Sequence, residues 1–339
     1  IKLEEKHFPV LLKELISIIS PLYGGTFLDC TFGQGGYSKK ILEKKNNKII
    51  AIDRDKDVYE YAKKLEKKYK NRFHFLNTKF SEINRVKISS NDLKAIIFDL
   101  GYSTNQIKDL NKGLSFKSTG KLNMKMGLNS FSSHEVISNM SESNLNKIFK
   151  YYGDEKYSKK IAKKIVETRK SKIINTKDLT EIINHVKRNK YFKINNSTKV
   201  FQALRIFVNN EISELINGLI NAFYLIPVGG VIAVVTFHSI EDRIVKFFFK
   251  NYSTIKNSSR YVPFKENNNQ CFDLKNKKPI IPNVEELKLN PPSRSAKLRY
   301  AVKIKDECNF EEFIEKFKKL IDIENLQFDK WKSFFFLFQ

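Results

Sequence analysis

Apolar and polar positions follow a regular rhythm over the first hundred residues of the chain. Short apolar runs, rich in β-branched and aromatic residues, are separated by Lys-rich segments between the first three. The runs are TFLDC (26–30), KIIAID (48–53), RFHFL (72–76) and KAIIFDL (94–100). Runs of this length are typical of buried strands, and their alternation with helical segments predicts βαβ units on a parallel sheet.

The pattern changes at about residue 107, beyond which it predicts helices alone. In SESNLNKIFKYYG, Ser141 is placed to cap the start of a helix and Gly153 to stop its end. Another helix is expected within EKYSKKIAKKIVETRK. Its apolar positions recur one turn apart, at Tyr157, Ile161 and Ile165.

The sheet pattern returns after residue 200. One long helix is predicted over 200–226, because apolar residues recur there at helical spacing. They are Phe201, Leu204, Val208, Ile212, Leu215, Leu219 and Phe223. PVGG ends this helix, VIAVVTF (231–237) is a buried strand, SIEDRIVKFFFK is a helix, and a last strand fits 295–304. Residues 251–292 are expected to be mostly polar loop.

These elements predict one α/β domain interrupted by a helical insertion. The interrupted domain covers 1–106 and 200–305, and the insertion covers 107–199. A C-terminal extension, 306–339, has the apolar spacing of a helix docked on the body, and we assign it no function.

The charge balance suggests a polyanionic partner. The chain has 62 Lys and Arg against 37 Asp and Glu, a formal net charge of +25. A compositional bias toward Lys and Asn, visible in KKNNK, explains such an excess equally well. Charge alone therefore supports nucleic-acid binding only weakly.

The three cysteines predict neither a disulfide framework nor a zinc site. Cys30, Cys271 and Cys308 lie far apart, without C-x-x-C spacing, which fits a reducing compartment. The longest apolar runs are shorter than the ~18 residues that a membrane span needs. The N-terminal residues lack a signal-peptide pattern, so we expect a soluble intracellular protein.

Three glycines within four positions follow the first predicted strand. Gly33, Gly35 and Gly36, in TFLDCTFGQGGYS, lie where that strand turns into the first helix. Glycines in such a turn allow left-handed backbone and close approach of a ligand. Ser38 occupies the last glycine position of the dinucleotide fingerprint G-x-G-x-x-G, which weakens a dehydrogenase interpretation.

Two acidic residues are expected at the same sheet edge. Asp53 ends the second strand, where a carboxylate can accept hydrogen bonds from ribose hydroxyls, and Asp99 ends the fourth strand beside Gly101. Two carboxylates suit a ligand with a ribose and a positive charge. S-adenosylmethionine has both, whereas the pyrophosphate of NAD gains less from carboxylates. At this point both cofactors remain open.

Eight strings, in order along the chain, resemble the bacterial 16S ribosomal RNA cytosine-N4 methyltransferase family. They are DCTFGQGGYS, AIDRD, DLGYSTNQ, KGLSF, YGDEKYSKKIAKKIV, FQALRIFVNNEI, FHSIEDRIVK and NPPSRSAKLR. The resemblance as a whole spans residues 7 to about 304. The resemblance implies a class I methyltransferase domain, with a Rossmann-like, mostly parallel doubly wound sheet and a helical insertion for RNA recognition. It further implies transfer of a methyl group from S-adenosyl-L-methionine to N4 of a decoding-centre cytidine in small-subunit ribosomal RNA.

The resemblance also implies cofactor-binding residues. They are Gly35, Gly36, Tyr37, Asp53, Phe80, Asp99 and Gln106. Phe80 would lie against adenine, although core packing is its ordinary role. Tyr37 stands where the family usually has histidine, and Asn123 where it usually has aspartate; the second change puts a charge-based role at that position in doubt.

We expect Asp99, Ser103 and His238 to be the catalytic candidates. N4 methylation needs alignment and a proton acceptor rather than a covalent nucleophile. His238 follows the fifth strand, and the neighbouring Ser239 is a candidate helix N-cap. His7 matches the family too, with a buried structural histidine as the alternative. No cluster has metal-ligand spacing, so no metal is expected.

The helix at 155–170 carries the RNA-binding candidates, which lie off its apolar stripe. They are Lys159, Lys160, Lys163 and Lys164, and a solvated helix surface is the alternative for them. The expected partner is small-subunit ribosomal RNA or the assembled small subunit, with no membrane. The oligomeric state stays open, a homodimer included. We expect a bacterial cytoplasmic location, with an organelle matrix as the alternative.

Two other functions remain open. One is an amino-methyltransferase with another RNA or DNA target, whose D/N/S-P-P-Y/F signature is replaced here by DLGYS. The other is an inactive RNA-binding ribosome assembly factor, which turnover would distinguish.

Overall fold

The computed structural model forms two compact units. Residues are described over 9–85, 92–102, 112–115, 120, 122–127, 131–188, 195–253 and 269–326. The first unit comprises Ile1–Gly101 with Glu214–Lys316, and the second comprises Tyr102–Ser213 with Phe317–Gln339. No helix in the described parts is long and apolar enough to cross a membrane.

The first unit is built on a seven-stranded sheet of order β3-β2-β1-β4-β5-β7-β6. The strands are β1 (Gly25–Asp29), β2 (Asn47–Ile52), β3 (Phe73–Leu76), β4 (Leu93–Asp99), β5 (Val231–Thr236), β6 (Phe272–Asp273) and β7 (Lys297–Lys303). The first five are parallel, whereas β7 runs antiparallel to β5 and β6 antiparallel to β7. The predicted mostly parallel α/β sheet is confirmed.

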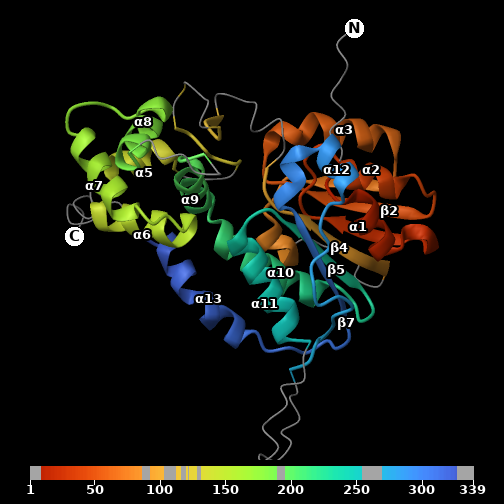
Figure 1. The fold of residues 1–339 in the computed structure, drawn as a ribbon. Coiled ribbons are helices and arrows are strands. Elements are labelled where there is room, and N and C mark those ends of the chain that lie inside the picture. The colour runs from red at the N-terminus through yellow and green to blue at the C-terminus, as the bar shows by residue number, and fades with distance from the viewer. Residues whose placement is uncertain are drawn as a thin grey trace, which may run out of the picture. The chain divides into compact units, whose positions relative to one another are not determined.

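Helices cover both faces of this sheet (Figure 1). One face packs Phe27, Ile97 and Val235 into a core with α1 (Leu12–Ile19), α2 (Gly36–Leu42) and α3 (Tyr59–Lys68). On the other face, α11 (Ser239–Asn251) contacts β5 and β7, and Phe98 lies near Gly218 of α10 (Glu211–Leu225). Because the central strands are buried on both sides, they appear in the sequence as continuous apolar runs.

The short elements after α11 were not predicted. β6 and α12 (Val284–Leu289) lie within 251–292, which the sequence indicated to be loop. A two-residue strand and a six-residue helix are too short to show periodicity. The remaining short helices are η1 (Pro21–Tyr23), η2 (Lys56–Val58), η3 (Phe80–Arg85) and η6 (Pro291–Ser295).

A disulfide joins Cys271 to Cys308, so the prediction that the cysteines form none was wrong. The pairing arises because β6 lies beside β7. The residue after β7, Ile304, stays next to the residue before β6, since Ile304 N donates to Cys271 O over 2.9 Å. This proximity depends on sheet pairing, which cysteine spacing does not reveal. Cys30 is free and buried.

The second unit is helical. Its helices include α5 (Ser133–Asn139), α6 (Glu142–Gly153), α7 (Ser158–Thr168), α8 (Thr176–Val186) and α9 (Thr198–Asn209). The predicted cap is confirmed, since the Ser141 side chain accepts from Asn144 N. Gly153 is the last residue of α6, but the left-handed residue that ends the helix is Asp154. A Cβ on Gly153 would lie 2.4 Å from Lys199 O, so glycine there allows α6 and α9 to approach closely.

The single long helix predicted over 200–226 was wrong. α9 ends at Asn209, Asn210 is left-handed with φ 49°, and α10 begins at Glu211. Asparagine is one of the few non-glycine residues that adopts this conformation readily. Apolar spacing continues across the break, so periodicity could not locate it.

The helix expected in the C-terminal extension is present as α13 (Glu311–Glu324). In the first unit, the Phe313 ring is fully buried and contacts the Phe248 ring at 5.0 Å. In the second unit, Glu324 Oε1 accepts from Ile212 N over 2.8 Å. Each end of α13 is therefore held by contacts within its own unit.

Candidate active site

Acidic side chains gather at the carboxyl ends of three neighbouring parallel strands. Asp29 ends β1, Asp53 follows β2, and Asp99 ends β4. β1 lies between β2 and β4, so these residues share one edge of the sheet. The crevice beyond such an edge, where the strand order reverses, is where open α/β sheets bind ligands.

The glycine turn connects β1 to α2. Gly33 has φ 54°, and a Cβ there would find its nearest neighbour, Thr31 O, only at 3.9 Å. Gly35 also has a positive φ, of 73°. Gly36 is needed for a different reason, because its Cβ would lie 2.2 Å from Pro9 Cγ. The turn thus combines left-handed backbone with close packing, and it leaves space beside Gly33.

Asp53 is held against this turn. Its Oδ2 accepts from Gly33 N and its Oδ1 accepts from Asp55 N, each over 2.8 Å. Desolvation raises the pKa of Asp53 to about 6, against the lowering effect of these two backbone hydrogen bonds. The carboxylate is therefore fixed in orientation beside the space at Gly33.

Asp29 is fully buried behind the turn. Ser38 Oγ donates to its Oδ2 over 2.6 Å, and Thr31 N donates to its Oδ1 over 3.3 Å. Burial raises the pKa of Asp29 to about 6. The sequence-based search considered the glycines and missed Asp29, although its place at the end of β1 matches that of Asp99 at the end of β4.

Asp99 is the most strongly perturbed of the three carboxyl groups. Burial, followed by the nearby Asp29 and Glu241, raises the pKa of Asp99 to about 8. Its backbone N donates to Thr31 Oγ1 over 2.6 Å. Its buried Oδ1 has no hydrogen-bond partner in the described part of the chain. A buried acceptor without a donor is the position at which a cationic ligand would gain most.

Tyr37 lies on α2 between Asp99 and the N-terminal segment. Its hydroxyl donates to the Val10 carbonyl oxygen and also contacts the Asp99 carboxyl group. The contact with Tyr37 lowers the pKa of Asp99, against the larger raising effects of burial and of the nearby Asp29 and Glu241. Burial raises the pKa of the Tyr37 hydroxyl as well.

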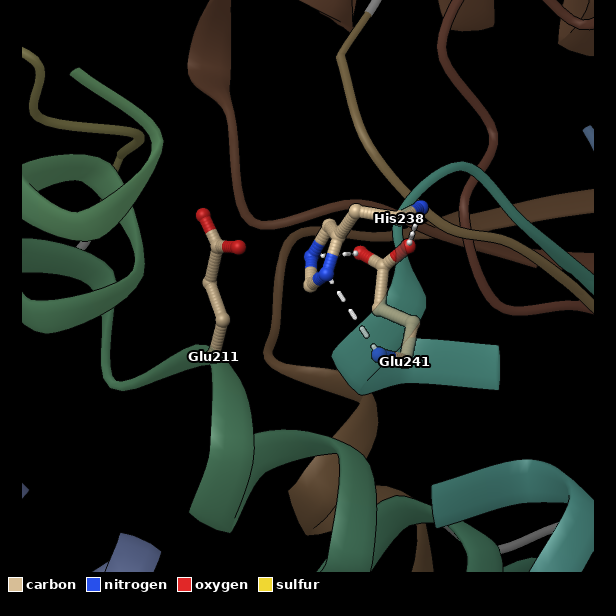
Figure 2. Close-up of side chains that lie close together, drawn as sticks. All are labelled: Glu211, His238 and Glu241. Carbon is tan, nitrogen blue, oxygen red and sulfur yellow. Dashed lines mark hydrogen bonds and ion pairs between the residues drawn. The ribbon is translucent and has the colours of Figure 1, made fainter. Parts of the chain in front are cut away.

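His238 caps the start of α11. Its Nδ1 accepts from Glu241 N at 3.4 Å, while its Nε2 lies 2.9 Å from Glu241 Oε1. Glu241 Oε2 in turn accepts from His238 N and Phe237 N, as Figure 2 shows for the first of these. Ser239, a candidate for the cap, is instead the first helical residue. The sequence-based search also missed Glu241, whose spacing from the cap is that of a capping box.

Phe80 is half-buried at the start of η3. Its ring meets that of Phe98 edge-on, with centroids 5.3 Å apart. A Cβ on Gly218 would lie 2.5 Å from Phe80, so the two are in close contact. The core-packing role is thus present in the structure.

Three further predicted residues, His7, Ser103 and Gln106, lie outside the described residues. Asn123 is half-buried, and its backbone oxygen accepts from Ser133 N over 2.9 Å.

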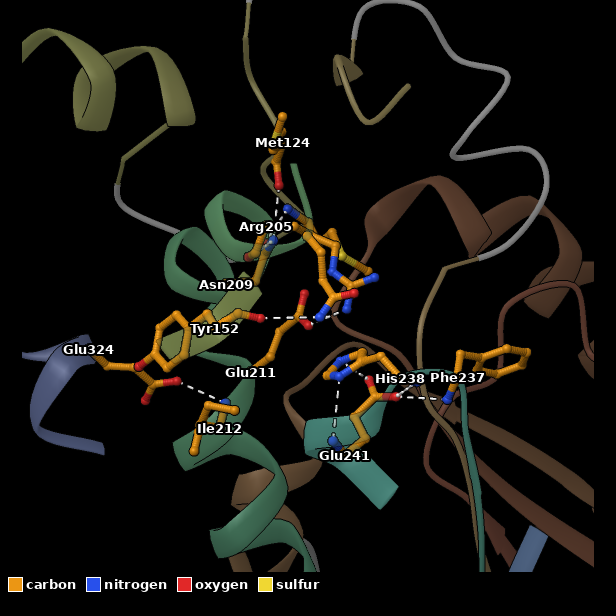
Figure 3. A network of polar contacts seen from close by, with 12 residues as sticks. Met124, Tyr152, Arg205, Asn209, Glu211, Ile212, Phe237, His238, Glu241 and Glu324 are labelled. Carbon is orange, nitrogen blue, oxygen red and sulfur yellow. Dashed lines mark hydrogen bonds and ion pairs between the residues drawn. The ribbon is translucent and has the colours of Figure 1, made fainter. Parts of the chain in front are cut away.

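A polar network lies within the second unit, on the FQALRIFVNNEI motif. The Asn209 side chain donates to Met124 O and accepts from Met126 N, each over 2.9 Å. Arg205 Nη2 lies 2.7 Å from Glu211 Oε2 (Figure 3). The arginine also lies over the Tyr102 ring, 4.5 Å from its centroid. The polar residues of the motif therefore have a structural role, since Asn209 binds the backbone of the segment that contains Met124 and Met126.

The candidate RNA-binding lysines lie on α7. Lys159, Lys160 and Lys163 are exposed, whereas Lys164 is half-buried and lies 3.7 Å from Glu167. The apolar stripe of this helix is buried, with Ile161 and Ile165 fully inaccessible. Three of the four ammonium groups therefore project into solvent.

The chain is similar to known proteins over most of its length. A model of the MraW methylase family matches residues 4–304. The Ribosomal RNA small subunit methyltransferase H of Ehrlichia canis (strain Jake) is 43% identical over 303 residues, covering 88% of this chain and 100% of the relative. The protein of the same name from Rickettsia bellii (strain OSU 85-389) is 40% identical over 307 residues, covering 89% of this chain and 100% of the relative.

Solved structures are less similar. An rRNA methylase from Streptococcus thermophilus superposes with a TM-score of 0.37 at 9% identity, covering 86% of this chain and 96% of that one. A superposition this loose supports no conclusion about this chain.

Proposed function

The chain belongs to the MraW methylase family, and on that premise we propose that it transfers a methyl group from S-adenosylmethionine to N4 of a cytidine in small-subunit ribosomal RNA. The observation that carries the proposal is the buried, unpaired Asp99 Oδ1, which lies at the sheet edge with Asp29, Asp53 and the glycine turn. Methyl transfer is assigned to the first unit and RNA recognition to the helices of 107–199.

The residues at the sheet edge fit this cofactor. S-adenosylmethionine supplies an activated methyl group on a sulfonium, together with an ammonium and a ribose. Asp53 would accept from the ribose hydroxyls, and the unpaired Asp99 Oδ1 would face positive charge. Bare backbone at Gly33 allows close approach of the ligand, because no side chain fills that space. NAD would place a pyrophosphate among three carboxyl groups, which is unfavourable.

Asp99 is also the residue proposed to accept the proton from N4. The N4 lone pair is delocalised into the cytosine ring, so attack needs alignment and an acceptor for the departing proton; alignment alone can supply up to ~7–11 kcal/mol. Positive charge beside Asp99 would favour its ionised form. His238 Nδ1 accepts from Glu241 N and caps the start of α11, so we assign His238 to positioning that helix.

The cysteines argue for N4 rather than C5 of cytosine as the target. Methylation at C5 usually proceeds through a cysteine thiolate that attacks the ring. Burial, and then the neighbouring Asp29, raises the pKa of the Cys30 thiol and keeps it protonated. Cys271 and Cys308 are joined in the disulfide. None of the three is suited to that role.

Nucleoside mass spectrometry tests the proposal. Small-subunit RNA from cells without this protein should lack N4-methylation that cells with it contain, and purified protein should restore the mark in the presence of S-adenosylmethionine. Unchanged N4-methylcytidine in the deletion strain would refute the proposed product. Binding of RNA without turnover would favour the inactive assembly factor.

Asp53→Ala should weaken S-adenosylmethionine binding by about 1–3 kcal/mol, the range for a lost hydrogen bond to a charged group. Asp53 is the only acceptor proposed for the ribose, and its loss also frees Gly33 N. Isothermal titration calorimetry measures the effect. The matched control is Asp57→Ala, which removes an exposed carboxylate four residues away. Equal affinities in the two variants would contradict the assignment.

Changing Lys159, Lys160, Lys163 and Lys164 together to Gln should lower RNA affinity and its dependence on salt. Each lost phosphate contact reduces the slope of log affinity against log salt by about 0.7–0.9. Filter binding at several salt concentrations measures the slope, and cofactor affinity serves as the check on folding. A slope equal to that of the unmodified protein would leave these lysines as a solvated helix surface.

A further inference from the structure

We infer that α2 and α3 carry a second phosphate-binding surface, on the first unit, that contacts the RNA backbone. The surface consists of Lys39, Lys64 and Lys68, here called the α2–α3 lysine cluster. The inference rests on the proposed function, because it supposes an RNA substrate. It adds a contact on the unit that holds the cofactor, separate from the lysines of α7.

The cluster lies beside the glycine turn. Lys39 is on the first turns of α2, and its Nζ donates to Gln34 O, within the turn, over 2.8 Å. α3 packs against the same turn, since a Cβ on Gly35 would lie 3.6 Å from Leu65 Cδ2. Burial, then the charges of Lys64 and Lys68, lowers the pKa of Lys39. The ammonium groups of Lys64 and Lys68 therefore lie near enough to Lys39 to repel its charge.

No acidic residue on these helices neutralises the cluster. Glu43, just after α2, pairs with Lys40 at 2.7 Å, and Glu60 pairs with Lys63 at 3.6 Å. Glu66 accepts from Phe75 N over 3.2 Å. The cluster residues themselves form no ion pair within the described ranges.

The charges of the cluster destabilise α3. Lys64 and Lys68 are exposed and four residues apart, a spacing at which like charges repel on a helix. An unneutralised group of cations raises the local concentration of anions. A phosphate backbone would relieve the repulsion, so a polyanion is the partner that this arrangement favours.

Nucleic acid suits the surface better than a lipid membrane does. Lys68 Nζ lies 5.1 Å from the centroid of the Tyr69 ring, and the Arg72 guanidinium lies 5.2 Å from the same centroid. The Tyr69 ring is half-buried and packs against the core of the first unit, so it supports these cations rather than stacking a base. Lipid binding is less favoured, because an interfacial helix presents a broad apolar face to the membrane. On α3 the exposed large apolar side chain is Tyr59, and one such side chain does not make a broad face.

The position of the cluster also suits an RNA substrate. A base must leave its stack to reach a pocket at a sheet edge, so the backbone on either side needs to be held. Lys39 follows Gly36 by three residues, so the cluster begins beside the turn that forms one wall of the candidate site, and it ends at Lys68, the last residue of α3.

The test compares the protein with its triple variant Lys39→Gln, Lys64→Gln, Lys68→Gln. A small-subunit ribosomal RNA transcript is titrated at several salt concentrations. Three lost contacts should reduce the slope by about 2, which corresponds to roughly 100-fold in affinity at 0.1 M salt. The matched control, Lys277→Gln, Lys278→Gln, Lys288→Gln, removes three exposed charges from the same unit and should keep the original slope.

Three outcomes would overturn the inference: an unchanged slope in the triple variant, equal losses in the triple variant and the control, or loss of binding to anionic phospholipid vesicles alone. Failure of the proposed function is distinguishable from these. It would appear as absence of methylation by the unmodified protein. If only the inference fails, the unmodified protein still methylates RNA, and the triple variant keeps the original slope of affinity against salt.

Discussion

Asp99→Asn is expected to stabilise the ligand-free protein and to abolish S-adenosylmethionine binding. The pKa of Asp99 is raised from 3.8 to about 8, chiefly by burial, so the folded protein favours the neutral carboxyl group. Its ionisation therefore opposes folding, and the cost grows as pH rises from about 4 to about 8. A shift of this size corresponds to an upper value on the order of 5 kcal/mol. Asparagine cannot ionise, so the variant avoids this cost.

Denaturant unfolding at pH 4, 6 and 8.5 measures the first part of this prediction. The gain in free energy of unfolding should be near zero at pH 4 and largest at pH 8.5. The control is Asp92→Asn, an exposed carboxylate just before β4, which should show no such trend. Calorimetry measures the second part. A variant that is less stable at every pH, or that binds the cofactor normally, would contradict the role assigned to Asp99.

Replacing Cys271 and Cys308 by serine should lower the free energy of unfolding by about 2–4 kcal/mol. The disulfide links residues 37 positions apart, and a cross-link of this span restricts the unfolded chain. It also anchors the chain just before α13, next to Phe310 and its contact with Phe248. Adding a reductant should destabilise the unmodified protein by a similar amount and leave the double variant unchanged.

Methylation should survive in this double variant, because neither cysteine belongs to the glycine turn or the acidic sheet edge. Equal stability of the unmodified protein with and without reductant would show that the disulfide does not form in solution. Complete loss of methylation in a folded variant would argue against the N4 mechanism.

Local pattern was sufficient for much of the fold. The strands from β1 to β5 were predicted to within a residue or two, because strands buried on both faces are apolar throughout and the edge strand β3 alternates between buried and exposed residues. The Ser141 cap was equally readable, since a hydroxyl three residues before a free N–H is a local arrangement. The break at Asn210 was not, because the apolar stripe keeps its phase across one left-handed residue.

Strands β1 to β5, the glycine turn, and the positions of Asp53 and Asp99 at strand ends were predictable from the sequence alone. The Cys271–Cys308 pairing depends on tertiary structure, as does the raised pKa of Asp99, which burial causes first and the nearby Asp29 and Glu241 increase. The physical reason is range. Backbone propensities and periodicity act over a few residues, whereas burial and charge interactions act through space between segments that sheet pairing brings together.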